Sequence, residues 1–352
     1  MIEEQDYLAK QNLHKLSDIG EFGWIDFLKQ NQGKLHDFVN EGIGDDAAVL
    51  TFPESSKVLW SSDMLVEGIH FDLSYTPLKY LGYKSIAVNV SDICAMYSTP
   101  ISVLVSIAVS NRFSIEALNE LYQGINLACE EYKISLIGGD TTSSRAGLMI
   151  SISIIGYNDT NDIVKRSGAS VNDLICVTGD LGAAYAGLQL LQREKKVFEE
   201  NPTVQPDLSS FEYVVGRQLR PTAKLGLINI LKEKGLIPSA MIDISDGLGS
   251  ELHHLCKANS FGAKIFSDRI PIDFQTKSVA ELFYTDVEQY AIYGGEDYEL
   301  LFTVNPKYFE EIKSIEGISI IGYTVNEELG IVIETKAGDE IEIKNSGWDS
   351  FI

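Results

Sequence analysis

The sequence predicts a two-domain protein of the α/β class, in which strands and helices alternate along the chain. Short apolar runs followed by glycine and an acidic residue alternate with stretches whose apolar side chains recur at helical spacing. The length of 352 residues gives room for two domains of ordinary size. A polar turn cluster at residues 158–162 interrupts the alternation, so we expect domains at residues 1–157 and 158–352.

The first predicted domain contains amphipathic helices and apolar strands. Leu118, Leu121 and Ile125, for example, recur at the three- and four-residue spacing that places side chains on one helix face. Ser135-Leu-Ile is expected to be a strand that ends in a turn at Gly138-Gly139. We expect helices at residues 16–30, 77–92 and 114–132, and strands at residues 48–52, 57–63, 101–109, 135–137 and 148–157.

The second predicted domain repeats this alternation. Residues 194–212 are charged and polar and contain two prolines, so we expect a mobile surface segment there. Strands are expected at residues 174–178, 241–244, 318–325 and 331–343, and helices from residue 183 and over residues 251–258.

Composition excludes several classes of protein. The formal net charge of −23 repels nucleic acid and anionic membrane surfaces, so we expect neither as a partner. The four cysteines are far apart and show no metal-binding spacing, as in a reducing compartment. The N-terminus lacks the apolar segment of a signal peptide, and no apolar run is long enough to cross a bilayer. We therefore expect a cytoplasmic protein.

Acidic residues recur next to glycine or hydroxyl residues at the predicted ends of apolar segments. The clearest example is residues 241–250, where an apolar strand leads into Asp243, Ser245 and Asp246, then into glycines and a helix. Backbone N–H groups at a helix start bind phosphate, and carboxylates bind magnesium. Asp and Ser are also common helix caps, so one such stretch alone favours a structural explanation. The six acids that we expect to converge on one cleft are Asp46, Asp63, Asp92, Asp140, Asp243 and Asp246.

Hard oxygen ligands without paired Cys or His favour magnesium, and several acids together favour phosphoryl transfer assisted by more than one ion. Residues 42–47 superficially match a dinucleotide fingerprint, but a strand follows them and two aspartates would repel a bare phosphate. The P-loop motif, the protein-kinase motifs and G-x-S-x-G are absent from the sequence. Direct in-line transfer therefore fits better than a covalent intermediate.

Other polar residues allow two interpretations each. His70 could contact a substrate phosphate or be a half-buried structural histidine, and Lys165-Arg166 could clamp a nucleotide phosphate or lie on the surface. Arg217 and Arg220 are expected on the surface, and His253 and His254 are expected to be structural. Glu296 lies in a predicted glycine turn, and Trp348 is either a C-terminal anchor or a platform for an aromatic ring.

Several blocks of this sequence together resemble the thiamine-monophosphate kinase family. They occur in the family's order from near residue 17 to residue 351, so the resemblance covers almost the whole chain. The blocks are Gly44-Asp-Asp-Ala, Ser62-Asp-Met-Leu-Val-Glu-Gly-Ile-His-Phe71, Asn89-Val-Ser-Asp92, Gly138-Gly-Asp-Thr-Thr142, Asp243-Ile-Ser-Asp-Gly-Leu248 and Gly294-Gly-Glu-Asp-Tyr-Glu-Leu300.

The resemblance implies magnesium-dependent transfer of the γ-phosphoryl group of ATP onto thiamine monophosphate, which gives thiamine diphosphate and ADP. It also implies the two-domain fold of aminoimidazole ribonucleotide synthetase, whose N-terminal half forms a β-barrel across a homodimer. The implied magnesium ligands are Asp46, Ser61, Ser62, Asp63, Asp92, Asp140, Asp243 and Asp246, of which Asp63, Asp92 and Asp243 are the catalytic set. The implied ATP contacts are Tyr122, Gly139, Asp140, Arg166 and Ser245, and the implied thiamine phosphate contacts are His70, Glu296 and Trp348.

The sequence departs from the family pattern at two places. Ser61-Ser62-Asp63 stands where Ser/Thr-Thr-Asp is common, and Tyr293 stands before Gly294, where a small residue is common. Tyr293 could alter the floor of the thiamine pocket.

Three other types of protein compete with this family for the sequence. Selenophosphate synthetase shares the superfamily, but it needs a reactive Cys near the N-terminus, and Cys94 is the first cysteine here. Aminoimidazole ribonucleotide synthetase fits residues 294–300 and the C-terminal Trp less well than the thiamine enzyme does. A regulatory protein that binds a nucleotide or calcium at a degenerate site is the candidate from a different functional class, and the density of intact acids argues against it.

Overall fold

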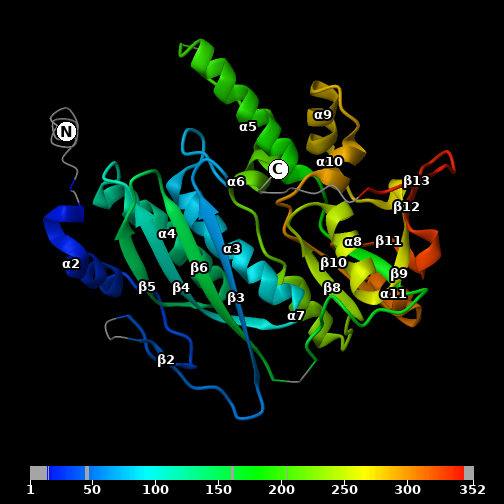
Figure 1. Ribbon diagram of the computed structural model, residues 1–352, viewed down its shortest axis with the longest axis horizontal. Helices are drawn as coiled ribbons and strands as arrows, with labels where there is room; N and C mark the ends of the chain where they lie inside the picture. The colour runs from blue at the N-terminus through cyan, green and yellow to red at the C-terminus, as the bar shows by residue number, and fades with distance from the viewer. Residues whose placement is uncertain (1–13, 15, 44–46, 160–161, 204, 345–352) are drawn as a thin grey trace. The chain divides into compact units, whose positions relative to one another are not determined.

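The computed structural model describes residues 14, 16–43, 47–159, 162–203 and 205–344 (Figure 1). The chain divides into two compact units. The first unit contains residues 1–90 and 99–161, and the second contains residues 91–98 and 162–352. The short segment 91–98 therefore groups with the second unit although it lies in the first half of the sequence. The assignment of functions to residues 1–157 and 158–352 stays a prediction.

The first unit is built on a four-stranded sheet. Its elements are α2 (Leu16–Gln30), β1 (Val39–Glu41), β2 (Val49–Leu50), β3 (Lys57–Val66), α3 (Leu78–Ala95), β4 (Thr99–Val109), α4 (Ile115–Tyr132), β5 (Ser135–Ser143) and β6 (Met149–Asn158). The strand order is β3-β6-β4-β5, and β1 pairs with β2 separately. The β3–β6 and β6–β4 pairs are antiparallel, whereas β4 and β5 are parallel and are connected through α4.

The two faces of this sheet differ in polarity and exposure. Side chains alternate between the faces along each strand, so β6 buries every second residue. Asn89 of α3 accepts a hydrogen bond from the backbone N–H of Asp63 at 3.1 Å, which ties α3 to one face. The opposite face, which we call the open face, presents large apolar side chains, and Trp60 is 69% exposed there. These apolar residues are Val58, Trp60, Met64 and Met149.

The second unit contains a seven-stranded sheet in the order β13-β12-β9-β11-β7-β10-β8. Most of its strand pairs are antiparallel; β9 and β12 are parallel. Its strands are β7 (Leu174–Thr178), β8 (Ala240–Ile244), β9 (Phe261–Phe266), β10 (Glu299–Val304), β11 (Ile318–Asn326), β12 (Ile331–Glu334) and β13 (Glu340–Glu342). Its helices are α5 (Ala183–Glu200), α6 (Glu212–Leu219), α7 (Leu225–Glu233), α8 (Leu248–Asn259), α9 (Phe274–Leu282), α10 (Val287–Tyr293) and α11 (Phe309–Lys313).

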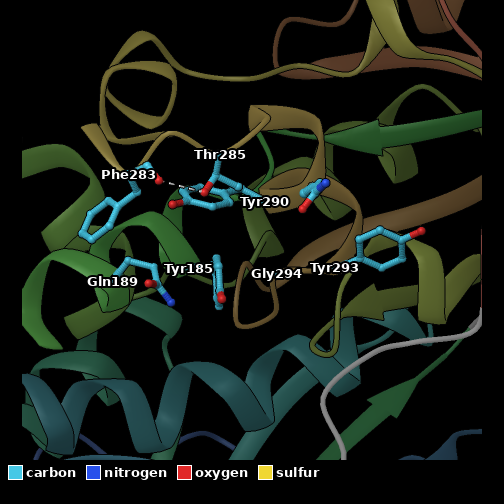
Figure 2. A pocket seen from close by; sticks show the side chains of 8 residues that line it. Tyr185, Gln189, Phe283, Thr285, Tyr290, Tyr293 and Gly294 are labelled. Atoms are coloured by element: carbon cyan, nitrogen blue, oxygen red, sulfur yellow. Dashed lines mark hydrogen bonds between the residues drawn. The ribbon is translucent and has the colours of Figure 1, made fainter. Parts of the chain in front are cut away.

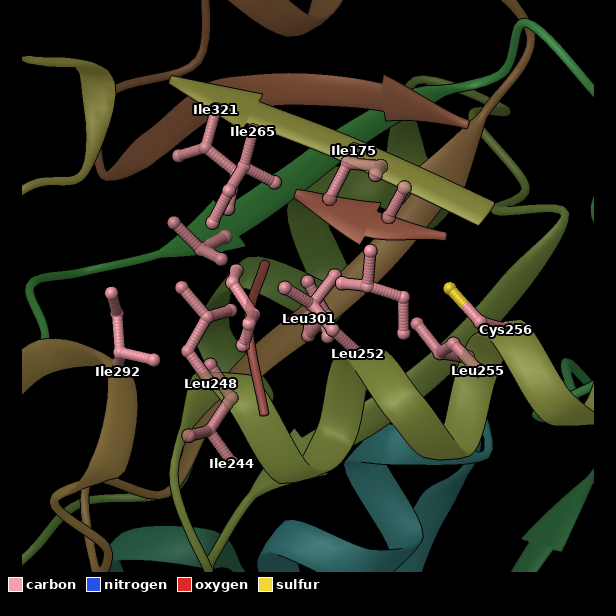
Figure 3. Packing of buried hydrophobic residues seen from close by; sticks show 14 of the residues in the cluster. Ile175, Ile244, Leu248, Leu252, Leu255, Cys256, Ile265, Ile292, Leu301 and Ile321 are labelled. Atoms are coloured by element: carbon pink, nitrogen blue, oxygen red, sulfur yellow. The ribbon is translucent and has the colours of Figure 1, made fainter. Parts of the chain in front are cut away.

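The core of the second unit lies between α8 and the sheet. Leu248, Leu252 and Leu255 recur at helical spacing on α8 and are at most 1% exposed. Figure 3 shows these side chains directed toward sheet residues that include Ile175 and Leu301. This packing fixes the start of α8 relative to the end of β8, which directly precedes it.

The predicted element types are largely confirmed, but three local predictions are wrong. Strand β5 continues through Gly138 and Gly139 to Ser143, so this glycine pair is not a turn. Asp63 lies inside β3, which continues to Val66, so it does not end a strand. Residues 194–200 belong to helix α5 and not to a mobile segment, although residues 196–200 are exposed, as expected for a surface position.

Two glycines let α3 and α4 approach closely in the first unit. A Cβ atom at Gly82 would lie 2.0 Å from the carbonyl oxygen of Leu121, and one at Gly124 would lie 1.9 Å from that of Lys79. Each helix therefore offers a side-chain-free position to the backbone of the other. Among the described helices, none has the length and apolar character needed to cross a bilayer.

Replacing Gly124 with alanine should therefore destabilise the protein. We expect Gly124→Ala to lower the free energy of unfolding by about 2 kcal/mol or more, because the added methyl group must push the helices apart. Gly226→Ala in α7 is the matched control, since no described atom lies within 4 Å of its would-be Cβ atom. That control should be neutral or stabilising by up to about 1 kcal/mol. Urea unfolding of both variants measures the difference, and equal effects would contradict the packing argument.

Candidate functional site

The turn between β8 and α8 carries the densest group of described acids. Asp243 is the fourth residue of β8 and is 7% exposed, and its Oδ2 accepts a hydrogen bond from the Ser91 hydroxyl at 2.8 Å. Gly247 has φ 115°, which favours glycine, and its would-be Cβ atom would lie 2.9 Å from the carbonyl oxygen of Ile292. The turn is therefore held both from residue 91 and from the end of α10.

Glu251 lies beneath this turn, in the first turn of α8. Its Oε1 accepts a hydrogen bond from the backbone N–H of Asp246 at 3.1 Å, whereas its buried Oε2 has no hydrogen-bond partner among the described residues. Burial raises the pKa of Glu251 to about 8, and the carboxylates of Asp246 and Asp243 act in the same direction. The turn therefore places a buried carboxyl group beside two aspartates, and a bound cation would favour the ionised form of that group.

Asp92 and Arg166 also lie near this turn within the second unit. Burial raises the pKa of the Cys94 thiol, and the charges of Asp243 and Asp92 act in the same direction, so both carboxylates lie close to Cys94. Burial lowers the pKa of His254 on α8, and the exposed Arg166 acts in the same direction. The structure thus brings Asp92, Asp243 and Asp246 into one region of this unit, with Arg166 near the same helix.

The segment 294–298 joins α10 to β10 and lies directly against this turn. The backbone N–H of Glu296 donates to the carbonyl oxygen of Ser245 at 2.7 Å, and that of Tyr298 donates to Ile244 at 2.8 Å. A Cβ atom at Gly295 would lie 2.5 Å from the Ser245 carbonyl oxygen, so only glycine fits there. The predicted substrate carboxylate and the predicted phosphate-binding turn are therefore neighbours.

A buried group of ion pairs supports the segment 294–298 from behind. Arg217 on α6 donates to Glu299 at 2.7 Å and to the backbone carbonyl oxygen of Asp297 at 3.2 Å. Lys224 contacts the same Glu299 oxygen at 2.7 Å. Both acids are 0% exposed. The expectation that Arg217 lies on the surface is wrong, because its guanidinium compensates these buried carboxylates.

Gln218, the next residue on α6, contacts Glu296 itself. Its Nε2 donates to Glu296 Oε2 at 2.7 Å, and Gln218 is 6% exposed. Gly187 on α5 makes room for this arrangement, because a Cβ atom there would lie 2.1 Å from the Val214 carbonyl oxygen and 3.1 Å from Gln218 Cβ. Close packing of α5 against α6 therefore sets where the Gln218 amide lies.

A cavity of about 240 Å³ lies next to Gly294, which is one of its lining residues. Figure 2 shows its aromatic walls, with Tyr185 and Tyr290 in an edge-to-face contact whose ring centroids are 5.1 Å apart. Tyr293, the residue that departs from the family pattern, is one of its lining residues. The cavity has no charged lining residue, and half of the residues that line it are aromatic. The lining residues are Tyr185, Gln189, Phe283, Thr285, Gln289, Tyr290, Tyr293 and Gly294.

In the first unit, Asp63 and Asp140 lie on strands at opposite edges of the sheet. Two strands separate β3 from β5, so the two backbones are about 14 Å apart. Side chains alternate along β3, so Ser61 shares a face with Asp63, and Ser62 lies on the open face, where its hydroxyl donates to the Ile152 carbonyl oxygen at 2.8 Å. The first unit by itself therefore does not bring these acids together.

Strand pairing explains the glycine at position 139, and core packing explains the tyrosine at position 122. A Cβ atom at Gly139 would lie 1.8 Å from the Val105 carbonyl oxygen, so the β4–β5 pairing requires glycine. Tyr122 is 3% exposed and packs edge-on against Trp24, and burial raises the pKa of its hydroxyl, which bonds to Thr141. Their contacts with ATP stay predictions.

His70 is held in a single ring orientation. Its Nδ1 accepts a hydrogen bond from the backbone N–H of Val66 at 3.1 Å. The ring proton is therefore on Nε2, which makes that nitrogen a donor for an acceptor such as a phosphate oxygen. A structural role and a phosphate contact are thus compatible in this residue.

Asp46 and Trp348 lie outside the described residues. Within the described ranges, no group of three or more His, Cys, Asp and Glu side chains is arranged to hold a metal ion unaided. Convergence of all six predicted acids stays a prediction. Sequence reasoning missed Ser91, Glu251, Arg217 and Gln218; Ser91 and Glu251 stand beside predicted acids, whereas nothing in the local pattern marks Arg217 or Gln218.

The chain matches the model of the family described as AIR synthase related protein, N-terminal domain, over residues 44–157. It is 33% identical to the thiamine-monophosphate kinase of Aquifex aeolicus over 96% of this chain and 100% of that protein. It is 39% identical to the thiamine-monophosphate kinase of Salmonella typhimurium over 76% of this chain and 77% of that protein.

Solved structures show the same relationship. The structure of AaThiL complexed with AMPPCP and TMP is similar with a TM-score of 0.73 at 31% identity, and the likeness covers 95% of this chain and 98% of that chain. The hydrogenase maturation protein HypE in complex with ATP, at 14% identity and a TM-score of 0.69, shares the fold alone. Because relatives of this identity align along nearly its whole length, the chain belongs to the thiamine-monophosphate kinase family.

Proposed function

We propose that this protein transfers the γ-phosphoryl group of ATP directly to thiamine monophosphate and so forms thiamine diphosphate and ADP, the last step of thiamine diphosphate synthesis. The supporting observation is the 2.7 Å hydrogen bond from Glu296 to Ser245. This bond places the residue Glu296, whose carboxylate could attract a cationic ring, beside the start of α8, whose backbone N–H groups could bind phosphate. AaThiL, described in complex with AMPPCP and TMP, presents the same pair of substrate classes.

The nucleotide phosphates are assigned to the start of α8, with the Ser245 hydroxyl and the Arg166 guanidinium as donors. Gly139, Asp140 and Tyr122 of the first unit are proposed to complete the ATP contacts. Glu296 would face the thiazolium charge, Trp348 would stack on a ring of the substrate, and His70 would donate from Nε2 to its phosphate. Residues 1–157 would thus serve metal, ATP and dimer contacts, and residues 158–352 would serve nucleotide and thiamine phosphate.

The donor set fits magnesium. The ion prefers oxygen ligands and is usually held by one or two carboxylates plus substrate phosphates, so a complete protein cage is not required. Asp243, Asp92 and Asp246 would supply carboxylates, and the buried Glu251, whose Oε2 has no hydrogen-bond partner among the described residues, lies beside Asp246. Asp46, Ser61, Ser62, Asp63 and Asp140 are the other proposed ligands. When bound, magnesium screens the phosphate charges and stabilises charge that develops on the transferred group.

The chain itself contributes positioning. Ser91 orients the Asp243 carboxylate through its 2.8 Å hydrogen bond, and Gly295 lets the segment that carries Glu296 lie against Ser245. In phosphoryl transfer a protein contributes mainly by holding the phosphate donor and the acceptor substrate in a fixed relative orientation. Direct transfer needs no protein nucleophile.

A homodimer is part of the proposal. The open face carries the exposed side chains of Val58, Trp60, Met64 and Met149, and a group of exposed apolar side chains on a sheet face favours an interface there. A second copy of the same face would bury it symmetrically, and closing the sheet edges would form a β-barrel across the dimer. The four cysteines, all free and buried, are consistent with a cytoplasmic location.

The reaction can be tested with purified protein, magnesium-ATP and thiamine monophosphate in an assay coupled to ADP. We expect ADP release that depends on thiamine monophosphate, together with thiamine diphosphate detected by chromatography. Free thiamine and AMP are the control acceptors and should give no ADP above background. ADP release with AMP alone, which lacks a thiazolium ring, would contradict the assignment of Glu296 to the acceptor substrate.

Asp243→Asn should reduce kcat by about 100-fold or more, because loss of a carboxylate removes several kcal/mol of metal-assisted stabilisation. Calorimetric titration with magnesium-ATP provides a second measurement and should show weaker binding. Asp268→Asn, which changes an exposed acid away from the turn, is the matched control and should behave as the unchanged protein. Wild-type turnover in Asp243→Asn would exclude this residue from the metal site.

Trp60→Glu should separate the subunits, because it places a charge at the centre of the proposed interface. Light scattering should give about twice 38.9 kDa for the unchanged protein and 38.9 kDa for the variant. Tyr284→Glu is the control, since Tyr284 is 99% exposed and lies in the other unit. A dimer that survives Trp60→Glu would place the interface elsewhere.

A further inference from the structure

The backbone around Glu296 is strained and is held in place from several directions. Glu296 has φ 67° and Tyr298 has φ 51°. Residues other than glycine adopt this left-handed backbone conformation only at a cost in free energy. Such conformations persist only where the surroundings fix them. The Ser245 and Ile244 carbonyl oxygens hold the two backbone N–H groups, as described above. These bonds fix the backbone but leave the direction of the Glu296 side chain to other contacts.

Helix α6 supplies the contact to that side chain. Arg217 and Gln218 are consecutive, so their side chains leave the helix about 100° apart. The Arg217 guanidinium reaches the buried acid Glu299, and the Gln218 amide reaches Glu296 at 2.7 Å. Helix α6 therefore donates hydrogen bonds to two acids, one from a charged guanidinium and one from a neutral amide. Arg217 supplies a cation to the structural acid Glu299, and Gln218 supplies a neutral amide to Glu296.

The neutrality of Gln218 has a physical consequence. An amide N–H orients a carboxylate through a hydrogen bond without cancelling its charge. A lysine or arginine at this position would hold Glu296 equally well and would also neutralise the attraction for a cationic ring. Because Gln218 is 6% exposed, the bond is shielded from water on the protein side.

We propose that Gln218 is a positioning and specificity residue for thiamine monophosphate, which it selects by orienting Glu296 while preserving its negative charge. This inference rests on the proposed function. It concerns the acceptor substrate alone, so ATP affinity should be independent of Gln218.

Gln218→Met tests the positioning, because methionine keeps the length of the buried side chain and removes the donor. We expect the Kd for thiamine monophosphate to rise about tenfold, as for loss of a hydrogen bond to a charged group. The Kd for a non-hydrolysable ATP analogue should change less than about twofold. Gln275→Met is the matched control. The Gln275 side chain, on α9, accepts a hydrogen bond from the backbone N–H of Tyr213 on α6. It has no hydrogen bond with Glu296 among the described residues. Calorimetry on the full chain measures each affinity.

Gln218→Lys tests the charge, because lysine retains an N–H donor and adds a positive charge. We expect it to weaken thiamine monophosphate binding at least as much as Gln218→Met does. Unchanged affinity in Gln218→Lys would overturn the role of neutrality, and it would do so even if Gln218→Met failed to fold.

A double-mutant cycle with Glu296→Gln separates this role from a structural one. If Gln218 acts through Glu296, Gln218→Met should add little in the Glu296→Gln background. Additive losses, or equal losses of acceptor and nucleotide affinity, would overturn the proposal. If the unchanged protein bound the ATP analogue and never used thiamine monophosphate, the proposed function itself would fail, a result that the unsubstituted chain alone reveals.

Discussion

The arrangement of the second unit depends on the ion pairs that Arg217 makes with buried acids. Burial raises the pKa of Asp297 to about 7, although Arg217 and two backbone N–H groups favour its charged form. Removing one partner of such a pair leaves a buried charge uncompensated and costs about 3–5 kcal/mol. A well-packed apolar cluster would stabilise a core as well. What the ion pairs provide is a defined geometry for the segment that leads into β10.

Two groups of acids in the second unit have different surroundings. Asp297 and Glu299 are buried and meet cations or N–H donors, so their charges hold the fold together. In the β8–α8 turn, burial is the main cause of the raised pKa of Glu251, and the nearby carboxylates of Asp246 and Asp243 act in the same direction. The formal charge of −23 is therefore not only a solubilising surface, because part of it is concentrated where a cation and phosphates would bind.

The sequence predicted what depends on periodicity and on local motifs. Apolar spacing located α4, β7 and β8, and the glycine–acid blocks marked the β8–α8 turn and the segment 294–298. The prediction of a turn at Gly138-Gly139 was wrong because glycine also occurs where strands pair closely, which is the role of Gly139. Sequence reasoning also failed where the partner is remote in sequence. Arg217 and Gln218 gain their roles from residues about 80 positions away, which no local pattern records.

The fold is shared with HypE, a protein only 14% identical, so the fold by itself does not fix the reaction. Substrate choice must come from side chains mounted on it. In the second unit Glu296, which is proposed to face the substrate, lies on a segment whose backbone donates a 2.7 Å hydrogen bond to the proposed phosphate-binding turn. The backbone of Glu296 is therefore fixed by this turn, whereas its carboxylate is contacted by the Gln218 amide of α6. Backbone position and side-chain direction at Glu296 are thus set by different elements, so a substitution on α6 can change one without the other.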